Sequence, residues 1–288
     1  MMAAGPRRLA IRLLPPARRF RALVAPLARF IEGGARFGYA ARGAVYVSVG
    51  VMALLAALRL SPHATGAIGA MRAWGAWPPG IALLWAAGLG LYAFAGWRAL
   101  QALFDADRLG AKPAALAERV GKAVSGLVYG TLAVSVFGVL DAIEDLHEVD
   151  DQAATQAAIG DVLAMPGGEA LVMALGALVL AAGVGNAVRA FIGHFTETLD
   201  CDPGQARLAG SLARVGYFAR GLAMLLAGGL TLMAGWHARA SEAYGVGGAL
   251  EVLKAQRFGH PLLGVIALGL IAFGLFSFFK ACLRRIGC

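Results

Sequence analysis

The stretch GYAARGAVYVSVGVMALLAAL, residues 38–58, decides the fold, because a glycine, tyrosine and arginine opening leads directly into an uncharged apolar run. A second stretch, GYFARGLAMLLAGGLTLMAGW at residues 216–236, repeats both the opening and the length of the apolar run. A helix needs about 20 mostly apolar residues to cross a hydrocarbon core of ~30 Å. Both stretches therefore predict membrane-spanning helices that begin with one shared motif.

The composition of the whole chain is also that of a membrane protein. Of its 288 residues, 59% are hydrophobic and only 15% are charged, and the mean hydropathy of +0.69 lies outside the range of soluble domains. A soluble all-helical protein is the alternative, but six long runs with so few charges argue against it. The predicted spans are residues 37–58, 81–103, 120–140, 168–190, 215–236 and 261–281.

The charges along the chain predict its orientation. The first 31 residues contain seven arginines and no acid, whereas residues 141–161 contain seven acids and neither lysine nor arginine. Because lysine and arginine collect on the cytoplasmic side, we expect the N-terminus to be inside and, with an even number of spans, the C-terminus also. Basic residues in the outer segments 59–80 and 237–260 weaken this orientation. The first 34 residues are predicted to form a basic amphipathic arm on the anionic inner leaflet.

Three copies of a two-helix unit follow from the repeated opening. The stretch VGKAVSGLVYG at residues 120–130 is the middle copy, and it departs from the other two by having a lysine and a serine in place of tyrosine and arginine. Each unit has a helix outward, a short amphipathic segment on the outer surface and a helix back. Parallel repeats are related by an axis along the membrane normal. The sequence therefore predicts an all-α integral membrane protein with six helices in a pseudo-threefold bundle, and its repeats are residues 35–115, 116–205 (with the acidic outer loop 141–161) and 206–288.

The repeated motif resembles that of a known family. The GYxARG opening, the lead into the last helix at Gln256, Phe258 and Gly259, and the phrase GLIAFGLFSFFKA are similar to the bacterial integral-membrane family called domain of unknown function 1206. The resemblance covers roughly residues 30–285. It implies a fold of three two-helix units and a location in the bacterial cytoplasmic (inner) membrane, and it brings no established activity or catalytic residues.

The motif residues are the candidate functional residues. Small residues spaced along one helix face let a neighbouring helix approach, so we interpret the glycines as packing positions. We expect the tyrosines to anchor at the membrane interface. We expect the arginines to snorkel to the headgroups, to stack over Tyr39 and Tyr217, or to bind helix-end carbonyls of the neighbouring repeat. The candidates are Gly38, Tyr39, Arg42, Gly43 and Tyr46 in repeat 1, Gly121, Lys122, Ser125, Gly126 and Tyr129 in repeat 2, and Gly216, Tyr217, Arg220 and Gly221 in repeat 3.

The remaining interior polar residues are mild, and Ser48, Thr131 and Asn186 are the main ones. No carboxylate falls deep in a predicted span, which argues against a proton- or ion-coupled pump. The histidines are dispersed and the three cysteines show no ligand spacing, so neither a cofactor nor a metal is expected. No nucleophile elbow, phosphate loop or zinc-protease motif is present, and we expect no catalytic residues.

These patterns favour a multi-pass membrane protein that binds lipid or a partner membrane protein and is not an enzyme. Its expected partners are anionic lipid headgroups at the basic arm and a possible membrane-protein partner. The net charge of +9 is explained by topology, so nucleic acid is not expected. A small channel or facilitator is the alternative function, and a membrane enzyme comes third.

Overall fold

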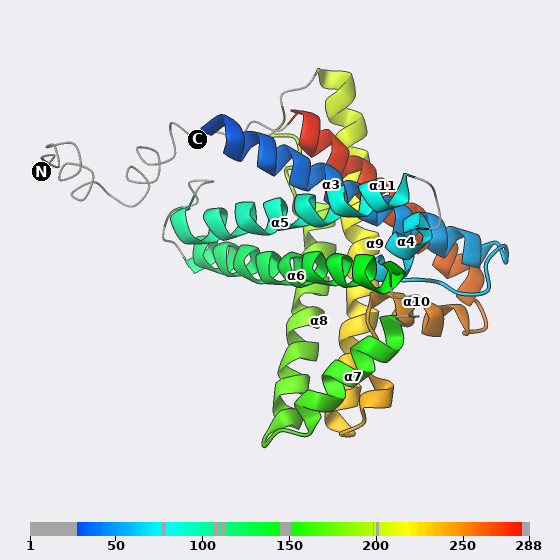
Figure 1. Ribbon diagram of the computed structural model, residues 1–288. Helices are drawn as coiled ribbons and strands as arrows, with labels where there is room; N and C mark the ends of the chain where they lie inside the picture. The colour runs from blue at the N-terminus through cyan, green and yellow to red at the C-terminus, as the bar shows by residue number, and fades with distance from the viewer. Residues whose placement is uncertain are drawn as a thin grey trace, which may run out of the picture.

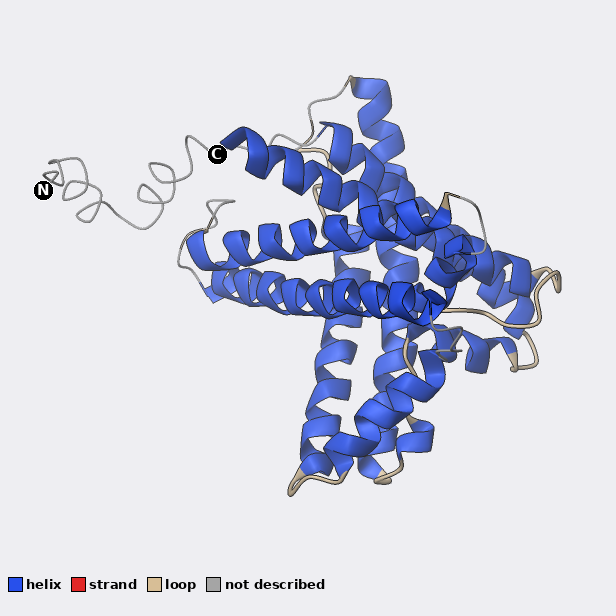
Figure 2. Ribbon diagram, viewed as in Figure 1, coloured by secondary structure: helices blue, strands red, loops and turns tan. Residues whose placement is uncertain are grey.

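The computed structural model describes residues 28–75, 79–105, 110, 113–144, 151–197, 199 and 202–283. In this part of the chain every element is helical (Figures 1 and 2). The basic arm before residue 28 and the loop residues 145–150 lie outside it. The six long helices are α3 (Ala28–Ala57), α5 (Gly80–Phe104), α6 (Pro113–Glu144), α8 (Gly168–Ile192), α9 (Pro203–Trp236) and α11 (Gly259–Leu283).

All six long helices are long and apolar enough to cross a membrane, which confirms the predicted number of spans. Helices α3, α6 and α9, which carry the repeated motif, begin well before the predicted spans. Their first turns are too polar for a hydropathy window but rich in alanine and arginine, which favour helix. Pro203 at the start of α9 fits the same reading, because proline is well accommodated in the first helical turn.

Three short helices join the long helices of each repeat, as the amphipathic segments predict. They are α4 (Ala67–Gly75), α7 (Asp151–Leu163) and α10 (Val246–Lys254), and a 3-10 turn, η2 (Ala240–Glu242), precedes the last of them. Met71, Ile159 and Leu250 occupy corresponding positions in these helices, and all three side chains are buried. The short helices therefore keep one apolar face against the long helices in every repeat.

The largest interhelical contacts join one repeat to the next. The return helix of each repeat packs along the motif-bearing helix of the following one: α5 on α6, α8 on α9 and, closing the ring, α11 on α3 (Figure 1). The same pairing rule thus holds at all three junctions between repeats. Repeats 1 and 3, which are distant in sequence, are joined as closely as sequential repeats.

Contacts within the repeats are not equivalent. Helix α3 packs on α5 in repeat 1 and α9 packs on α11 in repeat 3, whereas α6 and α8 of repeat 2 make no comparable contact among the described residues. In the view of Figure 1 the α5–α6 pair runs across the direction of the α8–α9 pair. The pseudo-threefold arrangement therefore stays a prediction, and so does the cytoplasmic placement of both termini.

Glycines of the motif lie where the paired helices are closest. A Cβ atom on Gly43 would lie 2.9 Å from the carbonyl oxygen of Gly274, and one on Gly221 would lie 2.9 Å from that of Gly183. At the third junction a Cβ on Gly126 would lie 3.3 Å from the Ala95 carbonyl. The small residues thus let backbone meet backbone at each junction between repeats.

Arginines two residues before the motif bind the ends of the return helices. Arg36 Nη1 donates to the carbonyl oxygens of Ala281 and Cys282 at the end of α11, at 3.2 and 2.5 Å. Arg119 makes the corresponding bonds from α6 to the end of α5, donating from Nε to Ala102 at 2.8 Å and from Nη2 to Leu103 at 3.1 Å. These bonds satisfy carbonyls that have no partner within their own helix.

Arg214, at the corresponding position of repeat 3, provides a test of this capping role. It is exposed, and no hydrogen bond joins it to the described residues. We expect Arg36→Ala to lower the free energy of unfolding by about 1–2 kcal/mol, because charge-assisted bonds to helix-end carbonyls are lost. Arg214→Ala should change it by less than about 0.5 kcal/mol. Unfolding of the two variants in detergent measures both values, and equal losses would contradict the capping role.

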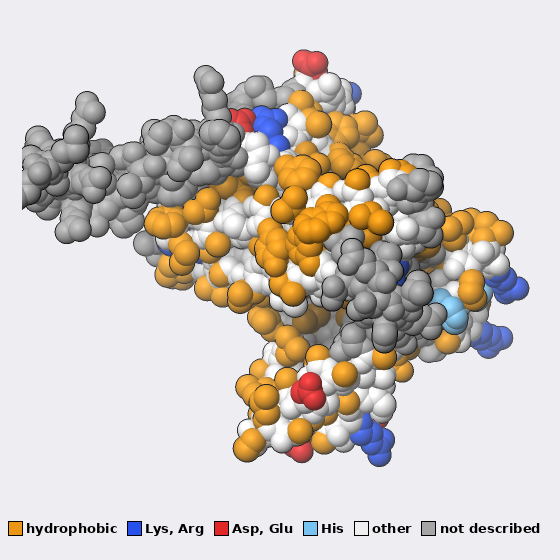
Figure 3. Space-filling model, in the orientation of Figure 1, with side chains coloured by type: hydrophobic (Ala, Val, Ile, Leu, Met, Phe, Trp, Pro, Cys, Tyr) orange, Lys and Arg blue, Asp and Glu red, His pale blue; other side chains and the backbone are white. Residues whose placement is uncertain are grey.

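Hydrophobic side chains cover much of the surface of the long helices. Figure 3 shows them over the face formed by α3, α5 and α6, while most charged side chains gather toward the ends of the molecule. Leu127 of α6 and Phe191 of α8 belong to this surface, with 74% and 75% of their area exposed. Apolar exposure of this extent suits helices surrounded by lipid.

Candidate functional site

A cluster of basic and aromatic side chains occupies the centre of the bundle, and each of the six long helices contributes to it. The two arginines come from corresponding positions of repeats 1 and 3, and the two tyrosines come from corresponding positions of repeats 1 and 2. We call the cluster the arginine–tyrosine centre. Its residues are Arg42 and Tyr46 of α3, Phe94 of α5, Tyr129 of α6, Asn186 of α8, Arg220 of α9 and Phe273 of α11.

The guanidinium of Arg42 lies among four aromatic rings. Its Cζ is 4.5 Å from the ring centroid of Phe273, 5.2 Å from that of Phe94, 5.4 Å from that of Tyr129 and 5.7 Å from that of Tyr46. The residue is only 2% exposed. Its Nε is buried and has no hydrogen-bond partner among the described residues. The positive charge of Arg42 is therefore enclosed by π faces that offer no strong hydrogen-bond acceptor.

Aromatic rings stabilise a guanidinium only in part. A cation–π contact is worth about 1–2 kcal/mol when it is shielded from water. Taking a charge out of water costs several kcal/mol, and each N–H donor left without an acceptor costs about 1–3 kcal/mol more. The rings around Arg42 offset the cost of taking its charge out of water. They do not offset the cost of its unsatisfied N–H donors, because the donors of a guanidinium need oxygen acceptors.

Arg220 also lies beside Tyr46, and it has direct hydrogen-bond partners. Its Nε donates to the Tyr46 hydroxyl at 2.8 Å, and its Nη1 donates to the Asn186 side-chain oxygen at 3.2 Å. Tyr129 donates its hydroxyl to that of Tyr46 at 3.3 Å. The side chain of Asn186 is fixed in turn by a 2.7 Å bond from its amide to the Ala182 carbonyl. A hydrogen-bonded chain thus links α6, α3, α9 and α8 at the centre.

The two arginines share aromatic neighbours. Each Cζ is about 5 Å from the ring centroid of Phe273 and within 5.7 Å of that of Tyr46. No carboxylate among the described residues forms an ion pair with Arg42 or Arg220. At a separation of up to about 10 Å and an effective dielectric of 20, two such charges repel by roughly 2 kcal/mol. The centre therefore carries two positive charges without a described negative charge to balance them.

Close backbone contacts in repeats 1 and 3 place two of the rings. A Cβ atom on Gly38 would lie 2.7 Å from the backbone nitrogen of Phe94, and one on Gly216 would lie 2.6 Å from that of Phe273. Any side chain at these glycines would push the return helix away. The motif glycines thus bring α5 and α11 near enough for their phenylalanines to reach the centre.

Repeat 2 lacks this arrangement. A Cβ on Gly121 would meet nothing within 4 Å, and the position that corresponds to Phe94 and Phe273 is Ala182. Ser125, half-buried, stands where the other repeats have arginine. Lys122 is buried and lies 3.3 Å from Glu118, one turn earlier on α6. Smaller side chains and an internal ion pair replace the motif chemistry in this repeat.

The structure corrects the roles expected for the motif arginines and tyrosines. Arg42 does not snorkel to the headgroups, because its guanidinium is buried among rings of four helices. The helix-end carbonyls are bound instead by Arg36 and Arg119. Tyr39 and Tyr217 do not anchor at the interface, since they are 0% and 7% exposed. The positions of these side chains are set by tertiary packing, and their distance from the membrane boundary does not determine that packing.

The tyrosines pack instead against aromatic side chains inside the protein. Tyr39 meets Phe94 edge-on with 5.1 Å between ring centroids. Tyr217 stacks on Phe195 at 4.9 Å and meets Phe273 edge-on at 5.2 Å. Edge-on and stacked pairs of this kind add to the stability that burial alone supplies. Both tyrosines thus pack against phenylalanine rings of the arginine–tyrosine centre.

Of the interior polar residues, only Asn186 belongs to the centre. Ser48 accepts a hydrogen bond from the Trp74 indole at 3.0 Å, which ties α4 to α3. Thr131 is exposed and donates to the Leu127 carbonyl of its own helix at 3.1 Å. Although Ser48 and Thr131 occupy matching positions, they face different surroundings. The described polar residues therefore do not form a repeated lining around the centre.

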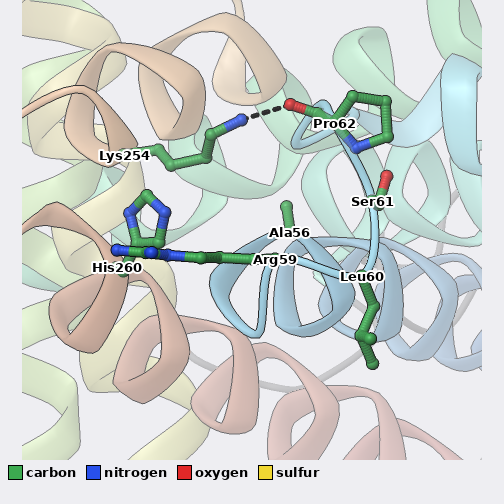
Figure 4. Close-up of a pocket in the computed structure, with 7 residues that line it drawn as sticks. All are labelled: Ala56, Arg59, Leu60, Ser61, Pro62, Lys254 and His260. Atoms are coloured by element: carbon green, nitrogen blue, oxygen red, sulfur yellow. Dashed lines mark hydrogen bonds between the residues drawn. The ribbon is translucent and has the colours of Figure 1, made fainter.

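An open pocket at the far end of α3 is a second candidate site (Figure 4). Its volume is about 430 Å³, and its lining residues are Ala56, Arg59, Leu60, Ser61, Pro62, Lys254 and His260. Lys254 donates to the Pro62 carbonyl and, at 2.7 Å, to Glu251. Burial opposes ionisation of Glu251, but its hydrogen bonds with Lys254 and the Ala64 amide outweigh burial and lower its pKa. We interpret these contacts as a joint between the loop after α3 and α10.

No group of three histidine, cysteine or acidic residues is placed to hold a metal ion within the described part of the chain. Cys282 is a free, exposed thiol near the end of α11. The arginine–tyrosine centre therefore remains the candidate site with the strongest chemical character. Its positive charge and its buried, unsatisfied donor suit an anion.

The fold and its site define a polytopic helical membrane protein in which three two-helix units supply one central cluster. The family model described as "Domain of Unknown Function (DUF1206)" matches the chain three times, at residues 37–105, 120–193 and 215–284. The chain belongs to this family, which confirms the resemblance inferred from the repeated motif. Each matched segment contains one motif-bearing helix and its return helix.

A protein of Bacillus subtilis (strain 168) described as "Uncharacterized protein YxxB" is similar to this chain along most of its length. The two are 27% identical over 258 residues, which cover 87% of this chain and 90% of the other. No solved structure matches the chain. The similarity therefore extends over all three repeats and is not confined to a single unit.

Proposed function

We propose that this protein is a non-catalytic, lipid-binding helical bundle of the bacterial inner membrane. The observation that carries the proposal is that, among the described residues, α6 and α8 of repeat 2 pack on each other far less than the helix pairs of repeats 1 and 3 do. We call the faces of these two helices that do not pack on each other the repeat-2 opening. In the other repeats the corresponding faces are closed by helix packing at Gly38 and Gly216.

The low burial of α6 and α8 also supports an opening in repeat 2. In α6 and α8, 22% and 17% of the apolar span is buried, compared with 39–56% in the other four spans. Gly121, at the start of this face, has open space where a side chain would be. Helices of a membrane bundle that do not pack on protein must pack on lipid or on a partner.

Charge favours an anionic lipid at this opening. Lys122 and Arg189 lie near the motif end of α6 and α8, and both are close to Glu118, at 3.3 and 3.8 Å. One acid thus serves two basic side chains. In the predicted orientation this end faces the cytoplasm, where anionic headgroups attract basic residues by about 1 kcal/mol each. The excess of arginine before the first span supports that orientation and the inner membrane.

The alternatives have less support. A conducting path along the centre would have to pass the rings of Phe94, Phe273, Tyr46 and Tyr129, which pack around Arg42. A catalytic role would need reacting groups, and the described centre offers only guanidinium, hydroxyl and amide donors. A partner membrane helix could occupy the repeat-2 opening in place of lipid, and the experiment below separates these occupants.

Lipid retention tests the proposal. The full chain is purified from membranes in mild detergent, and bound lipids are measured by native mass spectrometry and by extraction. We expect anionic lipid to be retained by the wild type. Ala182→Phe places on α8 the ring that repeats 1 and 3 carry, and it should reduce retention several-fold because it fills space on the side facing the opening.

Ala177→Phe is the matched control. Ala177 is exposed, and so are Leu89 and Leu268 at the corresponding positions of α5 and α11, so the control adds the same ring on a face that is exposed in every repeat, away from the opening. Retention should be unchanged in this variant, and thermal unfolding verifies that both variants are folded. The proposal is contradicted if the wild type retains no lipid. It is also contradicted if a co-purified membrane protein cross-links to α6 and α8.

A further inference from the structure

We propose that Arg42 and Arg220 together bind one oxyanion, a phosphate or carboxylate group, at the arginine–tyrosine centre. This inference goes beyond lipid binding at the repeat-2 opening, because it assigns a site and a ligand chemistry inside the bundle. The two can fail separately. Lipid bound at the opening, with no stabilisation of the folded protein by phosphate or phosphatidic acid, would leave the first proposal standing and remove the second.

The first argument is the state of Arg42. The residue is only 2% exposed, its Nε has no hydrogen-bond partner among the described residues, and its Cζ lies near four aromatic rings. An arginine in a membrane span is expected to pair with an acid or with backbone carbonyls, or to face a water-filled cavity. Among the described residues Arg42 forms no ion pair and its Nε has no acceptor, so its donors are available to a bound ligand.

The second argument is the position of Arg220. Its guanidinium shares the rings of Phe273 and Tyr46 with Arg42. Two like charges on the same rings repel each other, and an anion held between them converts this repulsion into attraction. The hydrogen bonds of Arg220 to Tyr46 and Asn186 orient its guanidinium and use Nε and Nη1, which leaves Nη2 for a further acceptor. The pair is thus arranged to receive a third, negatively charged group.

The third argument is the asymmetry of the repeats. Repeat 2 has Ser125 where the others have arginine and Ala182 where the others have phenylalanine. Both substitutions shorten the side chain on the side where α6 and α8 are apart. A ligand that enters from the repeat-2 opening would therefore meet small side chains before it meets the two arginines.

The chemistry of the centre selects an oxyanion. Guanidinium groups present planar, paired N–H donors that match the oxygens of phosphate and carboxylate. The hydroxyl of Tyr129 adds a polar group beside them. A cation is disfavoured by the two positive charges, and water can accept the hydrogen bonds but cannot balance the charge. The headgroup of an anionic amphiphile and a small free anion share this chemistry.

Anion-dependent stability of the full chain tests the site. The delipidated protein in non-ionic detergent is unfolded thermally at constant ionic strength with inorganic phosphate, with a short-chain phosphatidic acid, or with a short-chain phosphatidylcholine. We expect one of the first two to raise the unfolding temperature in a saturable way, because a ligand that binds only the folded state stabilises it. Stabilisation by phosphate identifies a free anion as sufficient, and stabilisation by phosphatidic acid alone identifies an amphiphile.

The variants Arg42→Gln and Arg220→Gln should each lower the apparent affinity for the anion at least tenfold. Arg257→Gln is the control, because Arg257 is an exposed arginine outside the centre. Arg42→Lys keeps the charge and loses the paired donors, and it should give an intermediate affinity. If Arg42→Gln does not fold, Arg220→Gln and Arg42→Lys still decide the matter.

A purely structural arginine predicts a different pattern. The stability lost in Arg42→Gln would then be the same at every anion concentration, whereas an anion site makes the loss grow as the anion concentration rises. The proposal is overturned if neither phosphate nor phosphatidic acid stabilises the wild type more than phosphatidylcholine does. It is also overturned if the stabilisation persists in both glutamine variants.

Discussion

Gly38→Ala is expected to lower the free energy of unfolding by about 1–3 kcal/mol, whereas Gly121→Ala should leave it unchanged or raise it by up to about 1 kcal/mol. A Cβ atom on Gly38 would lie 2.7 Å from the backbone nitrogen of Phe94, so α3 and α5 must separate to admit it. The same atom on Gly121 meets nothing within 4 Å, and alanine favours helix. Denaturant titration of the two variants in detergent measures the difference.

The contrast uses the repeat as its own control, because the two glycines occupy corresponding positions in the sequence. Gly216→Ala extends the test to repeat 3, where a Cβ would lie 2.6 Å from the backbone of Phe273, and it should behave like Gly38→Ala. Similar losses in Gly38→Ala and Gly121→Ala would show that repeat 2 is packed as tightly as the others. That result would remove the repeat-2 opening.

Phe273→Ala is expected to give the largest single loss, about 3–5 kcal/mol of the free energy of unfolding. The ring is 1% exposed, and it packs on Tyr46 and Tyr217 as well as on the guanidinium groups of Arg42 and Arg220. Its removal leaves a cavity and takes from both arginines the ring that they share. Thermal or chemical unfolding in detergent measures the loss.

Phe191→Ala is the matched control for this substitution. Phe191 is 75% exposed on α8, so truncation exposes little protein that was previously covered. Its one described ring contact, an edge-on pair with Phe218 at 5.9 Å, accounts for a change of up to about 1 kcal/mol. If Phe273→Ala cost no more than Phe191→Ala, the rings could not be what holds the arginines in place.

Most of the fold could be predicted from the sequence, because it depends on features that sequence displays directly. Apolar runs of sufficient length predict the spans, and the recurring glycines predict three units with short helices between their spans. The closure of the ring through α3 and α11 is consistent with equivalent repeats. The open side of repeat 2 was not predicted, although Ala182 at the position of Phe94 and Phe273 is a sequence difference that accompanies it.

The candidate site could be predicted in its residues but not in its roles. Arg42 and Tyr46 were found by their repetition, yet their burial depends on which helices surround α3, and this cannot be deduced from distance to a membrane boundary. The role of Arg36 was missed. The signal for it was present, since an arginine precedes each opening glycine by two residues, at Arg36, Arg119 and Arg214. These arginines lie just outside the apolar runs, so hydropathy alone does not indicate them.

A density map of the full chain in lipid nanodiscs containing anionic lipid addresses both proposals at once. We predict elongated density between α6 and α8, with its headgroup end directed toward Arg42 and Arg220, and no such density between α3 and α5 or between α9 and α11. A map in which α6 packs on α8 as α3 packs on α5, with nothing bound at the arginines, would contradict a lipid-binding bundle with an anion site at its centre.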